Sequence, residues 1–389
     1  MTNAEEKTEK LPYLLYFLQP LLFSFIGLAD SIYLSISHYR THTDLYYSSF
    51  CAISNTINCD MVSQSPWSVL INLPAPLWGV FAYLLYLLLL LAMRKDNDNW
   101  RSVWCFLFTL GMIYSFSSIV FAFISIKIIR AYCIPCIVSY GANLLLWFYP
   151  WFIRRRFDRT PFLKCLKQAF STLRTTQWLK KALLSLAGIF IALQIFLPRY
   201  WEIHPRMPSE LPNGLTEEGH PWLGAENPTL TIHVFSDYLC FRCYQYNFFL
   251  RQFASTHPKD VRIVHHHYPL DHEFNPIAAP KPFHIGAGKT ALLAIYAADK
   301  GLFWKTNDLL FLAAHGDKNE LDLKAIAESA GLDPREIHNK IFSPNTMKHL
   351  EKDIRLGLNY RIIATPSFVI GKEVFTGFLP ADILKNSLP

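Results

Sequence analysis

Apolar residues fall into five long runs along the chain. They cover residues 11–36, 77–93, 104–126, 133–153 and 182–198. A helix crosses the hydrocarbon core of a bilayer with about 20 mostly apolar residues, within a working range of about 17–25. The pattern therefore predicts five transmembrane helices. The first run is expected to be a retained anchor, because it has neither the basic flank nor the small-residue cleavage site of a secretion signal.

The pattern changes after the fifth run. Residues 199–220 are rich in proline and show no apolar periodicity, which is typical of a semi-rigid linker. Strand and helix patterns then follow one another. Strands are expected at 229–239 and 261–270, helices at 241–255, 287–300, 321–330 and 334–342, and a closing hairpin in the segments ATPSFVIG and EVFTGF. Strand, helix, strand, helices and two strands is an α/β order.

Charge supports the division into a membrane part and an aqueous part. Charged residues make up 17% of the chain, against about 25% in a typical soluble protein. Only 11 of them lie in residues 11–153, and 56 lie elsewhere. An ordinary soluble enzyme is therefore disfavoured. Nucleic acid is not an expected partner, because no basic face with interleaved aromatic residues is present, and the 30 Phe, 19 Tyr and 10 Trp exclude a disordered chain.

Basic residues in the loops indicate the orientation. Residues 154–181 hold nine Lys and Arg and one acid, and such loops stay on the cytoplasmic side. Alternation of the spans then places residues 1–12 inside as well. Residues 37–73 and everything after residue 198 should lie outside.

Six of the eight cysteines form pairs by their positions. The pairs are Cys51 with Cys59 in the first external loop, Cys133 with Cys136 as CIPC at the external mouth of the fourth run, and Cys240 with Cys243 as CFRC after the first predicted strand. All six fall on the external side, where thiols can be oxidised. Cys105 and Cys165 fall inside and are expected to be bystanders.

The CFRC motif follows a predicted strand and opens a predicted helix. Cys240 would then lie at the positive end of the helix dipole, which lowers its pKa and makes it the nucleophile. Cys243, one turn later, would be the resolving thiol. Half a zinc site is the alternative, but a structural zinc needs four ligands and this domain has no second CxxC. Pro366, in the segment ATPSF, would place a cis proline beside the pair.

The other two pairs allow more than one interpretation. CIPC lies next to the bilayer, where a lipid-soluble electron acceptor can reach it. Tyr140, one helical turn after Cys136, either points its hydroxyl at this site or belongs to the interfacial aromatic belt. Cys51 and Cys59 form either a static disulfide or a relay between the two CxxC motifs, because thiol–disulfide exchange requires direct contact between sulfurs.

Three other features of the sequence are weaker evidence for a function. The motif HIGAGKTA is not a phosphate loop, because Phe283 stands where the first glycine is needed. His265, His266 and His267 are expected to be polar or partly buried strand residues, because alternation places the middle one opposite the others; no metal site is expected. Asp30, inside the first run, is costly unless it faces the bundle or the interface. A structural role is favoured for it over a role in the redox site.

Together these features resemble the vitamin K epoxide reductase family. The residues that carry the resemblance are Cys51, Cys59 eight positions later, Ser65, Trp67, Pro76, Gly79 and CIPC with Tyr140. The later part resembles the bacterial fusion form with a DsbA-type thioredoxin fold, through HYPLDHEFNP and ATPSFVIG. The implied organisation is a cytoplasmic tail at 1–12, an all-α four-helix transmembrane domain at 13–153, a basic cytoplasmic loop at 154–181, a fifth transmembrane helix at 182–198, a linker at 199–220 and a periplasmic α/β thioredoxin-fold domain with a helical insertion at 221–389.

The resemblance also implies an electron path. Cys136 would contact a quinone, and Cys133 would accept electrons from Cys59. Cys51 would exchange with Cys240 in the thioredoxin-like domain. The implied enzyme is a quinone-dependent thiol oxidase of the bacterial inner membrane, which forms disulfides in periplasmic proteins.

Further expectations follow from the same resemblance. Ser65 and Tyr140 would contact the quinone, which is ubiquinone or menaquinone. Ala75 stands where members that reduce the vitamin K epoxide carry asparagine, which favours quinone reduction. The expected partners are reduced secreted or periplasmic proteins, the membrane lipid and its quinone pool, and a separate soluble DsbA-like protein. The alternatives are a membrane disulfide reductase or isomerase that runs in the opposite direction, and a tethered thioredoxin-fold chaperone or binding module with static disulfides.

Overall fold

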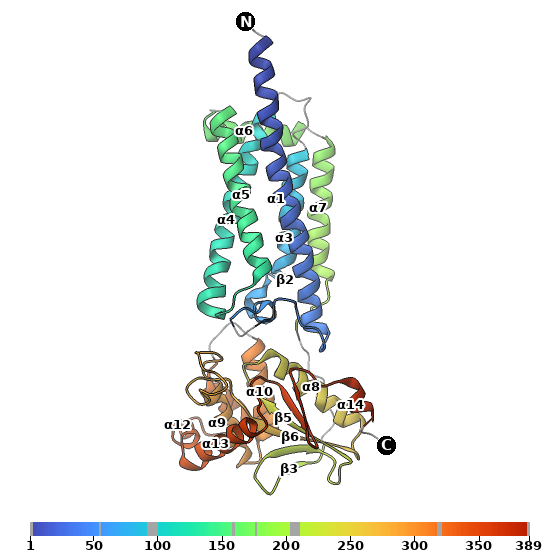
Figure 1. Cartoon of the computed structure of the whole chain (residues 1–389), viewed down its shortest axis with the longest axis vertical. Helices are drawn as coiled ribbons and strands as arrows, with labels where there is room; N and C mark the ends of the chain where they lie inside the picture. The colour runs from blue at the N-terminus through green and yellow to red at the C-terminus, as the bar shows by residue number, and fades with distance from the viewer. Residues whose placement is uncertain are drawn as a thin grey trace. The chain divides into compact units, whose positions relative to one another are not determined.

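The structure is a computed structural model, and it divides into two compact units, Met1–Trp201 and Glu202–Pro389 (Figure 1). It describes residues 3–53, 56–91, 100–157, 160–175, 177–202, 211–316 and 321–386.

Unit 1 is helical. Its long helices are α1 (Asn3–Thr43), α3 (Ala75–Leu91), α4 (Trp100–Phe123) with a π-helical extension (Ile124–Ile129), α5 (Ile134–Phe157) and α7 (Gln177–Phe196), and its shorter helices are α2 (Cys59–Gln64) and α6 (Phe162–Thr175). The five predicted apolar runs all form helices. Among the described residues, four helices are long and apolar enough to cross a membrane, and α3 is apolar but has 17 residues.

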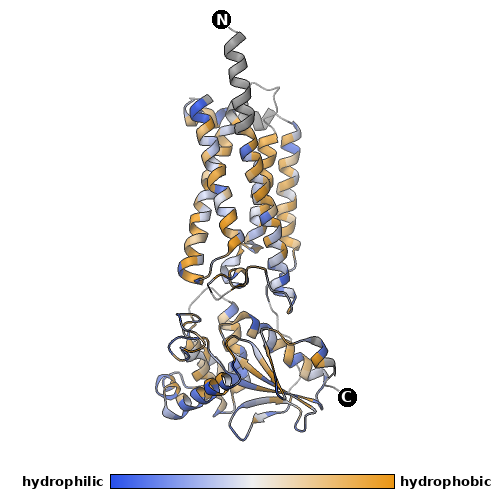
Figure 2. Ribbon diagram, in the orientation of Figure 1, coloured by the Kyte–Doolittle hydropathy of each residue, from blue (hydrophilic) through white to orange (hydrophobic). Residues whose placement is uncertain are grey.

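Most residues of these helices are hydrophobic (Figure 2), and their apolar side chains are exposed as well as buried. Phe116 on α4 and Ile195 on α7 are each 67% exposed. In water such a surface would be unfavourable, whereas in lipid it is the ordinary surface of a spanning helix.

Close helix packing holds the bundle together. Helix α1 contacts α3 and α5, α4 contacts α5, and α7 contacts α3. Gly111 of α4 lies against the backbone of Leu146 and Trp147 on α5, where a Cβ atom would overlap that backbone. The Tyr86 hydroxyl donates to the Leu146 carbonyl at 3.1 Å, so a buried polar atom is satisfied inside the apolar core.

Helix α6 lies across the end of the bundle, within the stretch predicted as a basic loop (Figure 1). Its apolar residues lie on one side, as is typical of a helix at an interface. Phe170 packs edge-on against Phe106 of α4, with ring centroids 4.9 Å apart.

Unit 2 is built on a six-stranded sheet in the order β3-β4-β6-β5-β7-β8. The strands are β3 (Asn213–Leu215), β4 (Pro221–Gly224), β5 (Leu230–Ser236), β6 (Val261–His267), β7 (Ser367–Ile370) and β8 (Glu373–Thr376). Strands β5 and β6 are parallel and the other pairs are antiparallel. Helix α8 (Phe241–Thr256) connects the parallel pair, as a βαβ crossover requires. The other helices are α9 (Ala287–Ala298), α10 (Phe303–Gly316), α11 (Leu323–Ala330), α12 (Ile337–Ile341), α13 (Pro344–Asn359) and α14 (Ala381–Asn386).

The predicted α/β order is confirmed, with additions. Helices α10 and α13 were not predicted, although Ser343 caps the start of α13 through the Thr346 amide and Pro344 occupies its first turn, which are usual start signals. Strand β3 lies inside the predicted linker, because residues 213–215 pair with β4. The part of the linker at 203–210 lies outside the described residues.

Candidate functional site

Two disulfides of unit 1 pack in one buried cluster. Cys51 is bonded to Cys59, and Cys133 to Cys136. The cluster also contains Leu34 of α1 and Val62 of α2. Cys51, Cys59 and Cys133 are at most 4% exposed. The structure thus brings together the two cysteine pairs that the sequence placed on one side of the membrane.

Backbone hydrogen bonds hold the loop that carries Cys59 against the segment before CIPC. The Asn58 amide donates to the Tyr132 carbonyl at 3.0 Å, and the Tyr132 amide donates to the Thr56 carbonyl at 2.7 Å. The Asn58 side chain also caps α2 by accepting from the Met61 amide at 3.1 Å. Cys59, the first residue of α2, is therefore positioned from both sides.

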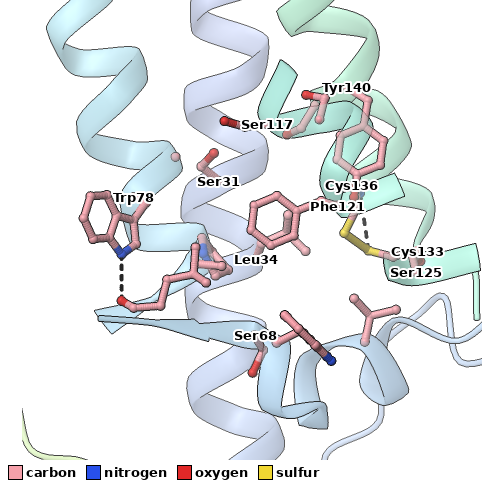
Figure 3. A pocket seen from close by; sticks show the side chains of 18 of the residues that line it. Ser31, Leu34, Ser68, Trp78, Ser117, Phe121, Ser125, Cys133, Cys136 and Tyr140 are labelled. Carbon is pink, nitrogen blue, oxygen red and sulfur yellow. Dashed lines mark hydrogen bonds between the residues drawn. A yellow bond between two sulfur atoms is a disulfide. The ribbon is translucent and has the colours of Figure 1, made fainter. Parts of the chain in front are cut away.

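A cavity of about 380 Å³ opens beside this cluster, within unit 1. Figure 3 shows the Cys133–Cys136 disulfide and Tyr140, both from the start of α5, facing it. Ser65 and Cys59 line it too, but Cys51 is not among the described residues that do. The predicted contact residues Ser65, Cys136 and Tyr140 therefore share one cavity.

The two predicted hydroxyl groups differ in their hydrogen bonds. The Ser65 hydroxyl donates to the Val62 carbonyl at 2.8 Å, so its lone pairs are left to accept. Tyr140 makes no hydrogen bond through its hydroxyl to any part of the chain that the structure describes, which leaves a donor beside Cys136. Ala75, from the start of α3, also lines the cavity.

Several polar residues of the cavity were not singled out from the sequence. Asn143, one turn after Tyr140, donates to the Ser118 hydroxyl at 2.9 Å and accepts from the Tyr83 hydroxyl at 2.7 Å. His38 of α1 contacts the Ser68 hydroxyl at 3.1 Å and lines the cavity. A polar side chain inside an otherwise apolar helix is the signal that would have identified both.

Asp30 is connected to the cavity through one hydrogen bond. The hydroxyl of Ser139, a lining residue on α5, donates to the Asp30 carboxylate. The carboxylate therefore faces the bundle, as the cost of placing it in lipid requires.

The second thiol pair lies in unit 2, where Cys240 is the N-cap of α8. Its sulfur accepts from the Cys243 amide at 3.4 Å and donates to the Thr365 carbonyl at 3.4 Å. The Thr365–Pro366 peptide bond is cis. Cys240, Cys243 and Pro366 therefore meet at one place, as the sequence predicted. Both cysteines are buried thiols.

A histidine–aspartate pair contributes to the pKa of Cys240. His284 Nδ1 lies 2.9 Å from Asp237 Oδ2, and the same carboxylate oxygen accepts from the Leu270 amide at 2.7 Å. Burial opposes the charge on His284, but Asp237 raises its pKa above the ordinary value. Asp237 thereby favours the positively charged form of an imidazole that acts on Cys240.

The two cysteines consequently have opposite pKa shifts. Burial alone would raise the pKa of Cys240, but its hydrogen bond with Cys243 and the charge of His284 lower it from 9.0 to about 7. Burial, together with Cys240, raises the pKa of Cys243 well above its usual range. His315 stays neutral, because burial lowers its pKa to about 4. Cys240 is therefore the more readily ionised thiol of the pair. The sequence argument from the helix dipole left out His284, which lies 47 residues from Asp237.

Two expectations require correction. Cys105 and Cys165 are bonded to each other, with Cα atoms 6.2 Å apart, and join α4 to α6; they were expected to be bystanders. The histidines of β6 are fully buried rather than partly buried, because helices cover both faces of this central strand. His265 and His267 pack on Phe303 of α10, and His266 faces α13.

Comparisons with known proteins agree with this division. Residues 20–151 match the vitamin K epoxide reductase family, and residues 231–388 match the DsbA-like thioredoxin domain. A search of the curated proteins gives no match. Unit 1 thus contains the match to the vitamin K epoxide reductase family and is the membrane part of the protein. Unit 2 has a thioredoxin-like α/β fold.

Solved structures similar to this chain include thioredoxin-like proteins. A thioredoxin-like oxidoreductase from Silicibacter pomeroyi is 22% identical, with 44% of this chain and 91% of that chain covered and a TM-score of 0.36. BdbD from Bacillus subtilis is 21% identical, with 46% and 96% covered and a TM-score of 0.36. A periplasmic thioredoxin-like protein from Salmonella enterica serovar Typhimurium is 21% identical, with 44% and 89% covered and a TM-score of 0.34.

Proposed function

We propose that this chain, which joins a vitamin K epoxide reductase family domain to a DsbA-like thioredoxin domain, is a quinone-dependent thiol oxidase that forms disulfides in other proteins. The observation that carries the proposal is the buried cluster of two disulfides beside an apolar cavity. A static pair of disulfides would need no cavity at the sulfur atoms. A relay needs both the contact between pairs and a place for an electron acceptor.

Electrons would pass through the three pairs in order. A substrate dithiol reduces the Cys240–Cys243 disulfide and leaves with a disulfide of its own. The resulting dithiol reduces Cys51–Cys59, and that pair then reduces Cys133–Cys136. Each exchange breaks one disulfide, forms another and transfers two electrons and two protons.

The lining of the cavity supports the order within unit 1. Cys59 faces the cavity together with Cys133, whereas Cys51 is not among its described lining residues. Cys59 is therefore suited to attack the Cys133–Cys136 disulfide, and Cys51 to exchange with Cys240.

The thiol chemistry of unit 2 supports the direction of flow. A disulfide is reduced faster when the departing sulfur has a low pKa, and its potential rises when the reduced pair is stabilised as a thiolate. Cys240 is the departing sulfur when the second thiol of the substrate resolves the mixed disulfide with Cys240, so its lowered pKa has both effects. The pair is therefore suited to accept electrons from substrate thiols rather than to donate them.

The residues around the cavity fit a quinone. A volume of about 380 Å³ lies in the usual range for small-ligand sites, about 300–1,000 Å³. Leu34, Trp78 and Phe121 provide an apolar surface for a ring, and Tyr140 provides a hydrogen-bond donor for a carbonyl oxygen. Bound there, ubiquinone or menaquinone would accept the two electrons and two protons that the reduced CIPC pair releases.

The proposed location is the bacterial inner membrane, with unit 2 in the periplasm. Nine basic residues in residues 154–181, between the fourth and fifth apolar runs, support this orientation. Reduced secreted proteins and a soluble DsbA-like protein are the proposed electron donors. Protease added to intact spheroplasts should remove unit 2; protection of unit 2 would contradict the orientation.

The test is reconstitution of the full chain in lipid with a quinone and a reduced peptide. The quinone should be reduced in proportion to the peptide disulfide formed, and Cys136→Ala should abolish quinone reduction while Cys105→Ala leaves it in place. Absence of quinone reduction, or an unchanged rate in Cys136→Ala, would contradict the proposal. A Cys59→Ser, Cys243→Ser double variant should trap a mixed disulfide between Cys51 and Cys240, and in cells an oxidase keeps Cys240 mostly in a disulfide.

A further inference from the structure

Unit 2 contains a second group of chemically reactive side chains, which includes neither cysteine. We call it the His–Asp cluster, and its members are His220 before β4, His266 on β6, and His349 and Asp353 on α13. Asp353 is fully buried, and His220 and His266 are at most 4% exposed. A buried carboxylate surrounded by imidazoles from three separate segments requires an explanation.

The distances within the His–Asp cluster are those of a metal-binding set. His220 Nδ1 lies 3.0 Å, and His266 Nδ1 3.4 Å, from the same oxygen, Asp353 Oδ1. The ligand atoms of these three residues all lie within 4.8 Å of one another. Around a tetrahedral Zn²⁺ with bonds of about 2.0–2.1 Å, neighbouring ligand atoms are about 3.3–3.4 Å apart. The contact from His266 matches this spacing, and the contact from His220 is slightly shorter.

Hydrogen bonds within the described chain do not account for all the nitrogen atoms. His220 Nδ1 is buried and makes no hydrogen bond, in spite of its distance from Asp353. His349 Nε2 is also buried without a hydrogen-bond partner, 3.9 Å from Asp353 Oδ2. Such atoms are costly when nothing satisfies them. One cation held by His220, His266 and Asp353 would satisfy the His220 nitrogen.

Neighbouring groups orient the proposed ligands. His266 Nε2 lies 2.9 Å from His233 Nδ1, and Phe235 stacks on the His266 ring with centroids 4.6 Å apart. Asp353 Oδ2 accepts from the His267 amide at 2.9 Å. Metal-binding histidines and carboxylates usually have their remaining atoms fixed in this way.

We propose that the His–Asp cluster binds one Zn²⁺ ion. Imidazole nitrogens with a carboxylate oxygen suit Zn²⁺, whereas Ca²⁺ and Mg²⁺ require oxygen ligands. The ion ties the segment before β4, strand β6 and helix α13 together, and so stabilises unit 2 without taking part in electron transfer. The sequence argument against a metal considered only the HHH run, and two of the three ligands, His220 and Asp353, lie outside it.

The experiment uses the full chain in detergent, purified without a polyhistidine tag and carrying Cys240→Ser and Cys243→Ser, so that no thiolate of that pair binds the metal. The protein is loaded with Zn²⁺, dialysed and analysed for bound metal by mass spectrometry. We expect about one Zn²⁺ per chain and a melting temperature that falls on addition of EDTA. Co²⁺ in place of Zn²⁺ should give d–d absorption bands without a thiolate charge-transfer band.

Variants separate the site from adventitious binding. Asp353→Asn should lose the metal and the effect of EDTA, whereas His338→Gln, an exposed histidine of α12, should keep both. If Asp353→Asn does not fold, His349→Gln serves instead. The His349 ring is partly exposed, so it can be replaced with little loss of packing. This variant should weaken Zn²⁺ binding by at least about tenfold. Bound zinc no higher in the parent than in these variants, or a Co²⁺ spectrum that they leave unchanged, would overturn the proposal.

Discussion

Replacement of His284 by glutamine tests the electrostatic account of the Cys240 thiol. The amide keeps a hydrogen bond to Asp237 but cannot carry the positive charge. The pKa of Cys240 should therefore rise from about 7 toward 9.0. Because the hydrogen bond with Cys243 remains in the variant, the full return to 9.0 is an upper limit.

The magnitude follows from these two values. At pH 7 a thiol with a pKa of 7 is about half ionised and one with a pKa of 9.0 is about 1% ionised, so the thiolate falls by at most about fiftyfold. Two pKa units correspond to about 2.7 kcal/mol, or about 60 mV for a two-electron couple. The lowered pKa of Cys240 stabilises the reduced pair by this full free energy above pH 9.0. The stabilisation is lost as the pH falls through about 7.

The assay is the rate of alkylation of Cys240 in the reduced full chain as a function of pH, followed by mass spectrometry of the Cys240 peptide. His284→Gln should react several-fold more slowly at pH 7 and equally fast well above pH 9.0. His338→Gln, at an exposed position of α12, is the matched control and should follow the parent. A pH profile of His284→Gln that coincides with the parent, in a variant with an unchanged circular dichroism spectrum, would refute the role of His284.

Three further predictions concern unit 1. Tyr140→Phe removes the free donor beside the CIPC pair, so the KM for quinone should rise by the equivalent of about 0.5–1.5 kcal/mol; an unchanged KM in the quinone-reduction assay would contradict the contact. Cys105→Ser with Cys165→Ser opens a 60-residue loop, which should cost at most about 4 kcal/mol of stability and lower the melting temperature while quinone turnover is kept. Gly111→Ala should destabilise the α4–α5 contact by about 1–3 kcal/mol, measured by thermal unfolding, whereas Gly188→Ala, where a Cβ meets nothing within 4 Å, should not.

Local sequence patterns were sufficient to predict the helices and strands that bury one face or span the bilayer. The length of the apolar runs alone predicted the long helices of unit 1. Strand β5 and the CFRC helix were predicted because the alternating pattern of a strand changes to a helical pattern at Cys240. The placement of the CxxC cysteines and of Tyr140 was also predictable. Residues three or four apart on a helix lie on the same face, so their relative positions follow from the spacing alone.

Contacts between distant segments were not predictable from such patterns. Asp237 and His284 are 47 residues apart, and Cys105 and Cys165 are 60 apart. Only the tertiary fold brings each pair together. The same holds for Asp353, which lies on a helix that was not predicted and is fully buried among imidazoles.

The burial of Cys51 bears on the selectivity of the proposed relay. Cys51 is fully buried, although Phe50 and Ile53 on either side are each 66% exposed. The Ser49 amide donates to Asp60 Oδ2 at 3.1 Å, which ties the segment before Cys51 to helix α2. Thiol–disulfide exchange requires direct access to the sulfur, so a small thiol in solution meets the apolar flanks rather than the disulfide. A protein that docks on those flanks can displace the loop, and the energy of docking offsets the cost of opening it. In the proposed oxidase, this arrangement admits Cys240 of a docked thioredoxin fold while it protects the oxidised pair from other reductants.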